Sequence, residues 1–160
     1  MTEPQILMTG IAFGESPRWH DDRLWFSDWG TQEIIAVDLE GESEVIVGVS
    51  SFPFCIDFLP DGRLLIVSAR DRLLLRREPD GSLVTHTDLS SLSEHPWNDI
   101  VVDGRSNAYI GNIGFEFPVG APLDEVVFRF VATDKHGHTA TFEPFKSKPS
   151  QLTILADSNS

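Results

Sequence analysis

The amino-acid sequence predicts an all-β protein, organised as a partial β-propeller of about three to four blades. Three observations support this prediction: a hairpin phrase that recurs along the chain, strand-sized segments between its copies, and the lack of an apolar pattern with helical period. The recurring phrase begins with the short apolar runs Leu24–Asp28, Leu64–Ser68, Ala108–Asn112 and Leu152–Ala156, whose first residues lie 40, 44 and 44 positions apart. Repeats of about 20 to 50 residues are typical of propellers and solenoids.

The first three runs each follow a polar turn, and this order predicts a hairpin. The turns are Asp21–Arg23, Asp61–Arg63 and Asp103–Arg105. Aspartate hydrogen-bonds to backbone groups further along its own turn, and glycine, present in the second and third turns, accepts a positive φ. We therefore expect two tightly connected antiparallel strands in each of these periods.

Between the hairpins the chain continues in short segments that are rich in β-branched or aromatic residues and bounded by Gly, Pro, Asp or Ser. The predicted strands are Glu33–Asp38, Val45–Val49, Leu73–Arg76, Leu83–His86, Ile100–Val102, Val126–Val131 and Thr139–Phe142. Only Asp88–Glu94 indicates a single helical turn. About four strands in a period of about 43 residues is the composition of a propeller blade. A two-sheet sandwich is the alternative, but it gives no reason for one hairpin phrase to recur at nearly constant spacing.

The length of the chain bounds the number of blades. Its 160 residues hold fewer than four such periods, whereas closed propellers typically have about 4 to 8 blades. We therefore interpret residues 1–160 as a single incomplete propeller domain. An open arc exposes strand edges that invite pairing with another chain. The arc is accordingly expected either to form a homodimer through its open blade edges or to have poor stability.

Composition excludes several classes of partner. The chain has 12 Lys and Arg against 25 Asp and Glu, a formal net charge of −13. Nucleic-acid binding needs a basic face, so we expect no nucleic-acid partner, and the same charge disfavours an anionic membrane surface.

No apolar run approaches the roughly 20 residues of a membrane-spanning helix, and residues 1–8 lack the features of a signal peptide. The single cysteine, Cys55, fits a reducing compartment, so we predict a cytoplasmic protein.

A candidate metal site follows from the phase of the repeat. The innermost strand of every propeller blade lines a central channel, so residues at one phase converge on the axis. The position nine residues before each apolar run is held by Glu15, Cys55, Asp99 and Glu143, and Asn98 adjoins Asp99. Oxygen donors at three of these four positions suit a hard divalent cation such as Ca²⁺. The alternative is coincidence of phase, since most acidic side chains are simply solvated.

Other residues with potential chemistry favour structural interpretations. His136 and His138 lie on one face of an extended segment, as in the start of a zinc site, but a solvated turn is the favoured reading because no acidic or Cys partner follows at ligand spacing. Cys55 is interpreted as a small core residue rather than a nucleophile. Trp97 is a weaker candidate for stacking on a sugar. Three other tryptophans, Trp19, Trp25 and Trp29, are expected to pack between blades.

Several longer phrases resemble one known family. They are Gly14–Trp19 with Leu24–Asp28, Phe58–Ser68 with Arg70–Gly81, and Asn98–Arg105 with Ala108–Phe115. Over residues 10–117 the sequence resembles the family of gluconolactonase, senescence-marker protein (regucalcin) and luciferin-regenerating enzyme. The resemblance implies a six-bladed propeller that carries one divalent metal ion, often Ca²⁺ or Zn²⁺, at the mouth of its channel. It also implies hydrolysis of sugar lactones.

The resemblance assigns roles to two residues of this chain. It implies that Glu15 is the first metal ligand and that Asn98 contacts the substrate beside the metal. The family's second ligand is an Asn in a Pro-Asn-Gly phrase, and its third is an Asp that also acts as the base. Residues 119–150 depart from the family pattern, and Phe142–Lys146 reads Phe-Glu-Pro-Phe-Lys where the second ligand is expected.

Two functional hypotheses therefore come from the sequence. The first is a metal-dependent hydrolase of sugar lactones that works poorly, because the second and third ligands and the catalytic base of the family are not found in the chain. The second is a non-catalytic propeller module that binds or assembles through its open blade edges by strand addition.

Overall fold

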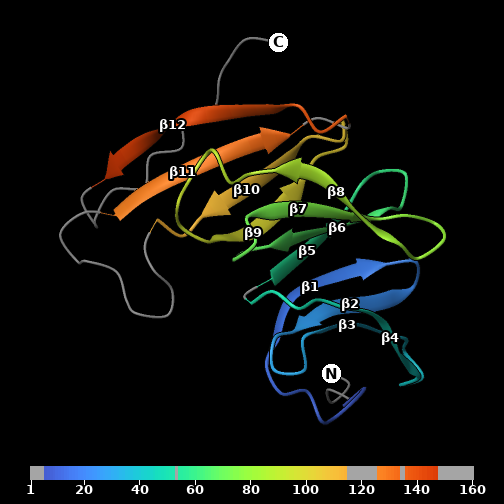
Figure 1. Ribbon diagram of the computed structural model, residues 1–160. Coiled ribbons are helices and arrows are strands. Elements are labelled where there is room, and N and C mark those ends of the chain that lie inside the picture. The colour runs from blue at the N-terminus through green and yellow to red at the C-terminus, as the bar shows by residue number, and fades with distance from the viewer. Residues whose placement is uncertain (1–5, 53, 115–125, 134–135, 148–160) are drawn as a thin grey trace, which may run out of the picture.

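The computed structural model describes residues 6–52, 54–114, 126–133 and 136–147, which form three antiparallel sheets of four strands (Figure 1). The first sheet comprises β1 (Gly14–His20), β2 (Arg23–Asp28), β3 (Glu33–Val37) and β4 (Ser43–Gly48); the second β5 (Phe54–Phe58), β6 (Leu64–Ser68), β7 (Leu73–Arg77) and β8 (Leu83–Asp88); the third β9 (Trp97–Val102), β10 (Ala108–Asn112), β11 (Val126–Thr133) and β12 (Thr139–Ser147). The described residues contain no helix, which confirms the all-β prediction. Within these ranges, accordingly, no helix has the length and apolar character needed to cross a bilayer.

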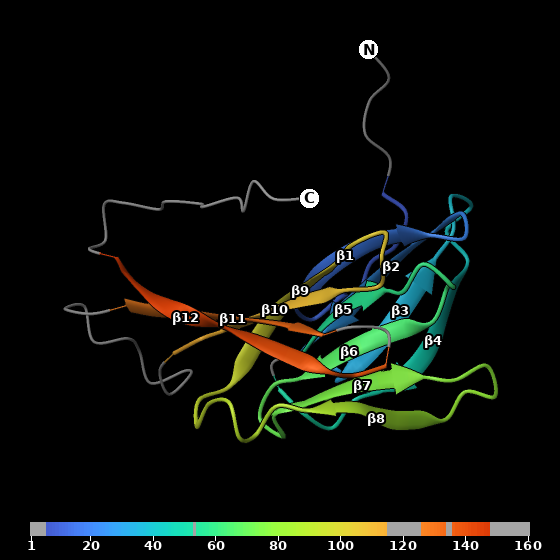
Figure 2. The same cartoon turned by 90° about the horizontal axis from the view of Figure 1, so that it is seen from above.

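Each sheet is built from strands that follow one another along the chain, in the orders β1-β2-β3-β4, β5-β6-β7-β8 and β9-β10-β11-β12. The first strands of the sheets lie side by side, because β1 contacts β5 and β5 contacts β9. Figure 2 shows β4 at the right-hand side and β8 along the lower edge, on the far side of their sheets from β1 and β5. This is the arrangement of propeller blades around a channel, and the predicted partial propeller is confirmed with three blades described.

The predicted hairpin turns are present and use different residues to supply positive φ. Asp21 and Asp22 have φ of 47° and 56° in the first turn, and Gly62 has φ of 85° in the second. In the third turn the left-handed residue is Ser106, with φ of 68°, although Gly104 lies two residues earlier. Asp103 closes this turn by accepting hydrogen bonds from the backbone N–H groups of residues 105 and 107 at 2.8 and 2.9 Å.

One apolar core fills the space between the sheets. It joins residues from all three, among them Trp25 and Trp29 of the first blade, Phe54 of the second and Trp97 of the third. The core position predicted for Cys55 is confirmed, since the residue is only 4% exposed. Trp97 is fully buried and therefore offers no face for stacking on a sugar.

Two expectations about individual residues were wrong. Trp19 is 55% exposed and does not pack between blades, because it lies near the solvent end of β1. Glu143 was expected on the innermost strand of a fourth blade, but β12 pairs with β11 as the outermost strand of the third blade. The Phe142–Lys146 phrase therefore does not occupy a channel position. The predicted run Leu152–Ala156 lies outside the described residues.

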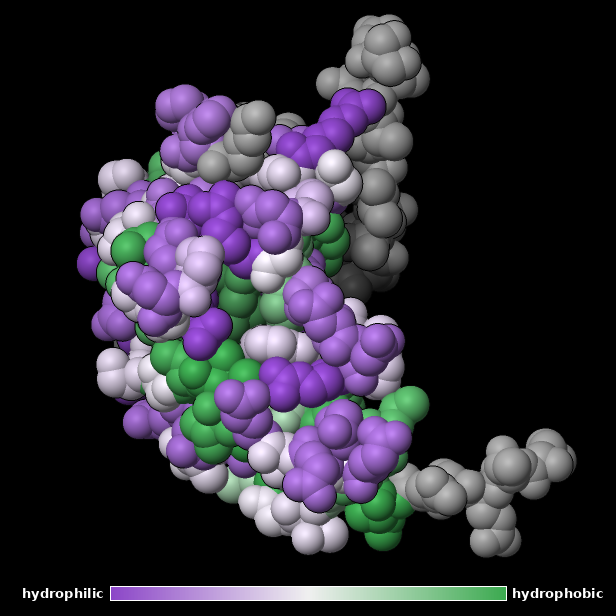
Figure 3. Space-filling view, turned by 90° about the vertical axis from the view of Figure 1, so that its right-hand side faces the viewer, coloured by the Kyte–Doolittle hydropathy of each residue, from purple (hydrophilic) through white to green (hydrophobic). Residues whose placement is uncertain are grey.

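The first blade also carries apolar side chains on its second face. Neighbouring residues of a strand point to opposite faces of the sheet, and Phe26 accordingly belongs to a separate cluster with Ile35 and Val37. Leu7 and Met8 cover part of this cluster, and a cavity of about 380 Å³ remains beside it. Apolar side chains also appear among hydrophilic ones on the side of the molecule shown in Figure 3.

Candidate functional site

The register of the sheets shows which channel residues are equivalent. The fourth residue of each apolar run pairs with an innermost strand as Ser27↔Glu15, Val67↔Cys55 and Gly111↔Asn98. Glu15, Cys55 and Asn98 therefore hold the same position in three successive blades. The two site residues that the sequence singled out thus hold equivalent positions on β1 and β9, the strands that flank β5, and Cys55 lies on β5 between them.

A β-bulge explains why a uniform count of nine residues selected Asp99 instead of Asn98. The β9–β10 register shifts between Ile110 and Gly111, and Asp99 is the extra residue, with φ of 41°. A similar irregularity follows Glu15 in β1, where Ser16 has φ of 53°. Glu15 and Asn98 each precede a left-handed residue. Because bulges re-aim side chains and are common beside active sites, this shared feature marks both positions as candidates.

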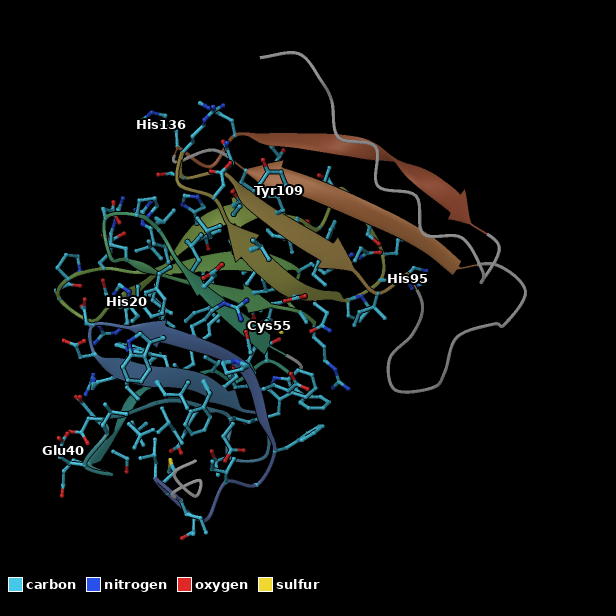
Figure 4. The ribbon with its side chains drawn as sticks, turned by 180° about the vertical axis from the view of Figure 1, so that it is seen from behind. His20, Glu40, Cys55, His95, Tyr109 and His136 are labelled. Atoms are coloured by element: carbon cyan, nitrogen blue, oxygen red, sulfur yellow. The ribbon has the colours of Figure 1, made fainter. Side chains whose placement is uncertain are left out.

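Cys55 is hydrogen-bonded to Asn98, its equivalent in the third blade. Its Sγ donates a hydrogen bond to Asn98 Oδ1 at 3.0 Å, and the sulfur accepts one from the backbone N–H of Asp99. Figure 4 shows Cys55 on β5, between the ribbons of β1 and β9. Burial raises the pKa of the thiol to about 11, and the carboxylates of Asp99 and Glu15 act in the same direction. The thiol is thus neutral at pH 7, and the negative charges of Asp99 and Glu15 both favour its protonated form.

The left-handed conformation of Ser16 is held by the neighbouring blade. Its buried hydroxyl donates to the carbonyl oxygen of Ile56 at 3.1 Å and accepts from the backbone N–H of the same residue at 2.9 Å. One side chain therefore satisfies both backbone groups of a β5 residue. Since Ser16 directly follows Glu15, this double hydrogen bond fixes the height of Glu15 along the channel.

Arg18 joins all three innermost strands. Its Nε lies 3.2 Å from Asp57 Oδ1, and its Nη2 donates to the carbonyl oxygen of Ile100 at 2.8 Å. Asp57 Oδ2 in turn accepts from the backbone N–H of Val102 at 2.7 Å. Sequence reasoning missed this network. Only the observed register shows that the two residues are equivalent, because Arg18 pairs with Trp25 and Asp57 with Leu65, the second residues of their apolar runs.

The described donors fit only part of a divalent-metal site. Glu15 is exposed and its Oε2 accepts a hydrogen bond from the backbone N–H of Ser16 at 3.2 Å. Asn98 is half-buried, and its oxygen is engaged by Cys55. No group of three or more His, Cys, Asp or Glu able to hold a metal occurs in the described part of the chain. Ca²⁺ takes about six to eight oxygen ligands, so these residues do not complete a coordination shell.

The two histidines that the sequence offered as the start of a zinc site do not add ligands to Glu15 and Asn98. His136 and His138 are exposed, and their ring centroids lie 6.1 Å apart with the planes tilted by 48°. The backbone between them contacts the second blade, where Thr87 Oγ1 donates to the carbonyl oxygen of Gly137 at 3.0 Å. These positions agree with the solvated turn that was favoured from the sequence.

The fold and the channel residues define a β-propeller arc with a polar centre. Residues 13–142 match the family model described as the SMP-30/Gluconolactonase/LRE-like region, and the chain belongs to this family. The recognition made from the three sequence phrases is thereby confirmed. No curated protein matches the chain.

Solved structures with the same fold come from several bacteria. A gluconolactonase from Xanthomonas campestris has a TM-score of 0.68 at 15% identity, covering 87% of this chain and 50% of its own. A calcium-binding regucalcin from Agrobacterium tumefaciens has a TM-score of 0.61 at 20% identity, covering 87% and 46%. Virginiamycin B lyase from Staphylococcus aureus has a TM-score of 0.53 at 12% identity, covering 84% and 56%. At these identities the likeness concerns the fold alone, and the chain spans about half the length of these structures.

Proposed function

We propose that the chain carries part of the cation and substrate site of a sugar-lactone hydrolase. In this site Glu15 is a ligand of a divalent cation, Ca²⁺ or Zn²⁺, and Asn98 contacts the lactone. The observation that carries the proposal is the equivalence of Glu15 and Asn98 on strands that flank β5, each before a left-handed residue. Membership of the gluconolactonase-like family supports it, as does a fold shared with a gluconolactonase and a calcium-binding regucalcin.

The chemistry of lactone opening explains the division of roles. Hydrolysis adds water across the ring ester, so the carbonyl oxygen must be polarised and a water molecule must lose a proton to a base. A bound divalent cation supplies the polarisation. Glu15 provides a formal negative charge for the cation, and Asn98 holds the lactone beside it by a hydrogen bond.

We propose further that the chain alone opens lactones poorly. Cation affinity rises with the number and charge of pre-positioned oxygens, and Glu15 is the one carboxylate assigned to the cation. Of the neighbouring carboxylates, Asp57 is engaged by Arg18 and by the backbone of β9. The Asp99 carboxylate is three-quarters exposed, and its Oδ1 accepts from the backbone N–H of Ile100 at 2.8 Å. Neither carboxylate is assigned the role of the base.

Hydrolysis of D-glucono-1,5-lactone tests this proposal. The purified chain is assayed with Ca²⁺ or Zn²⁺ beside Glu15→Ala and the matched control Glu40→Ala, whose side chain lies in the exposed β3–β4 turn (Figure 4). We expect rates close to the uncatalysed reaction for all three proteins and weak cation binding that is lost only in Glu15→Ala. A wild-type rate well above that of Glu15→Ala contradicts the proposed impairment. Equal cation binding by all three proteins contradicts the role of Glu15.

A second candidate function is assembly without catalysis. The specific observation that favours it is the apolar cluster on the second face of the first blade, together with exposed apolar residues before β1 such as Ile6 and Phe13. In this function a second copy of the chain binds at this open end of the arc, against the exposed face of the first blade. The cytoplasmic location inferred from the single cysteine remains a prediction for either function.

A further inference from the structure

The orientation of the Asn98 amide decides what this residue offers to a ligand. An asparagine side chain carries an acceptor oxygen on one side and two N–H donors on the other. If the oxygen faces the channel, Asn98 can ligate a cation. If the nitrogen faces the channel, Asn98 can only donate hydrogen bonds.

The hydrogen bond between Cys55 and Asn98 indicates this orientation. The Cys55 sulfur lies 3.0 Å from Asn98 Oδ1. The acceptor side of the sulfur is already used by the backbone N–H of Asp99, so the thiol proton is directed at the amide oxygen. Burial keeps this thiol protonated at neutral pH, and a protonated thiol that donates needs an acceptor opposite it.

We propose that Cys55 is a positioning residue that holds Asn98 Oδ1 toward β5, so that Asn98 presents its NH₂ group to the channel as a hydrogen-bond donor and does not ligate the cation. Among the described residues, Asn98 Nδ2 has no hydrogen-bond partner, and the residue is only half-buried. The ligand group that fits is an acceptor oxygen, such as a hydroxyl, ring or carbonyl oxygen of a lactone or of its open hydroxy acid. The role toward substrate rests on the proposed function, whereas the orientation itself does not.

The orientation is tested without any ligand. A neutron crystal structure of the deuterated chain shows which side of the Asn98 amide carries deuterons and where the Cys55 deuteron points. We expect the thiol deuteron to point at Oδ1 and the two amide deuterons to face the channel. Amide deuterons directed at Cys55 overturn the proposal, whatever the chain is found to bind.

The consequence for binding is tested by titration with D-gluconate and, separately, with Ca²⁺. We compare the 160-residue wild type with Cys55→Ser, which retains a donor, and with Cys55→Val, which keeps the side-chain volume without one. Loss of a neutral hydrogen bond corresponds to about 3- to 10-fold in affinity. We therefore expect Cys55→Val to weaken gluconate binding by about that factor, Cys55→Ser to restore it, and both to bind Ca²⁺ as the wild type does. Cys55→Ala serves in place of Cys55→Val if the valine is not accommodated.

Asn98→Asp provides a second variant of nearly the same shape that removes the NH₂ donor. It is expected to lose gluconate binding. Undiminished gluconate binding by Asn98→Asp or by Cys55→Val contradicts the inference, as does loss of Ca²⁺ binding in Cys55→Val. If the amide has the expected orientation but the wild type binds neither gluconate nor Ca²⁺, the proposed function fails and the positioning by Cys55 stands.

Discussion

Arg18 and Asp57 form an ion pair between the innermost strands of the first two blades, with Nε and Oδ1 3.2 Å apart. Each partner also bonds to the backbone of β9 in the third blade. The side chains are 25% and 17% exposed, so solvent screens the pair only in part. This network holds in place the three strands that carry the candidate site.

Replacement of Asp57 by asparagine is expected to destabilise the arc. The change keeps the shape and leaves Arg18 with only the exposed Asp99 carboxylate, at 3.9 Å, as an ionic partner. We expect it to lower the free energy of unfolding by about 1 to 2 kcal/mol, less than for a fully buried pair. Urea unfolding followed by tryptophan fluorescence measures the difference. The control is Glu44→Gln, which removes an exposed pair with Arg23 and is expected to cost no more than about 0.5 kcal/mol. Equal effects of the two substitutions argue against a role of Asp57 in joining the blades.

Ser106→Gly is expected to stabilise the third blade. Ser106 has φ of 68°, a conformation that costs a non-glycine residue roughly 1 to 2 kcal/mol. After the larger entropy of glycine in the unfolded chain is allowed for, a gain of about 0.5 to 1 kcal/mol remains. Thermal unfolding provides the measurement. Gly104→Ala is the control, because its φ is not left-handed and a Cβ there meets no atom within 4 Å. A lower melting temperature for Ser106→Gly contradicts the expectation.

Asp28 is expected to link stability to acid pH. Its carboxylate is buried, which alone raises the pKa, but hydrogen bonds from the backbone N–H groups of residues 12, 13, 30 and 31 outweigh burial and hold the pKa below its usual value of 3.8. A lowered pKa contributes stability that is present above pH 3.8 and is lost as the pH falls through the folded-state pKa. Asp28→Asn is therefore expected to be less stable at pH 7 and to lose less stability between pH 5 and pH 2. Acid titrations monitored by circular dichroism compare it with Glu40→Gln. Parallel curves for Asp28→Asn and the wild type contradict this linkage.

Cys55 is expected to link stability to alkaline pH. Burial raises the pKa of the thiol from 9.0 to about 11, so the folded state holds its proton over a range in which the unfolded chain releases it. Stability is therefore fully present below pH 9 and falls as the pH rises from about 9 to 11, by about 2 to 3 kcal/mol. Cys55→Ser has no thiol and therefore lacks this pH-dependent part of the stability. The difference in the free energy of unfolding between the wild type and Cys55→Ser, measured in urea at each pH, isolates it. A constant difference from pH 8 to pH 11 means that the thiol is not shielded as described.

Assembly through the first blade is tested by Ile11→Glu. Ile11 is 42% exposed and lines the cavity beside the cluster of Phe26, Ile35 and Val37. If this face binds a second copy, sedimentation velocity shows a dimer that Ile11→Glu dissociates. The control Leu39→Glu, in the exposed β3–β4 turn, leaves the dimer intact. A monomer at all protein concentrations removes the assembly function.

Local patterns predicted much of the fold. The apolar runs at Leu24, Leu64 and Ala108 became β2, β6 and β10 within one residue, because hairpin turns and alternating burial act over a few neighbouring positions. The count of nine residues back from each apolar run failed to find the channel position in the third blade and at Glu143. The extra residue Asp99 moved the channel position to Asn98, and β12 used the phrase around Glu143 to complete the third blade.

The candidate site was predicted only in part, for a different reason. Glu15 and Asn98 were found through the phase of the repeat and the family resemblance. The contacts that position them join residues about 40 positions apart, such as Ser16 to Ile56 and Cys55 to Asn98. Such contacts depend on how neighbouring blades dock, and no local pattern encodes which side chains meet there.

Paramagnetic relaxation by Mn²⁺ tests most directly whether Glu15 and Asn98 share one channel. Manganese substitutes for other oxygen-bound divalent cations and broadens NMR signals near its site even when binding is weak. We predict that sub-stoichiometric Mn²⁺ broadens the amide signals of Glu15, Cys55 and Asn98 together, and that Glu15→Gln abolishes all three effects while Glu40→Gln does not. Broadening at Glu15 that leaves Cys55 and Asn98 sharp would place the two site residues on separate surfaces and contradict the account.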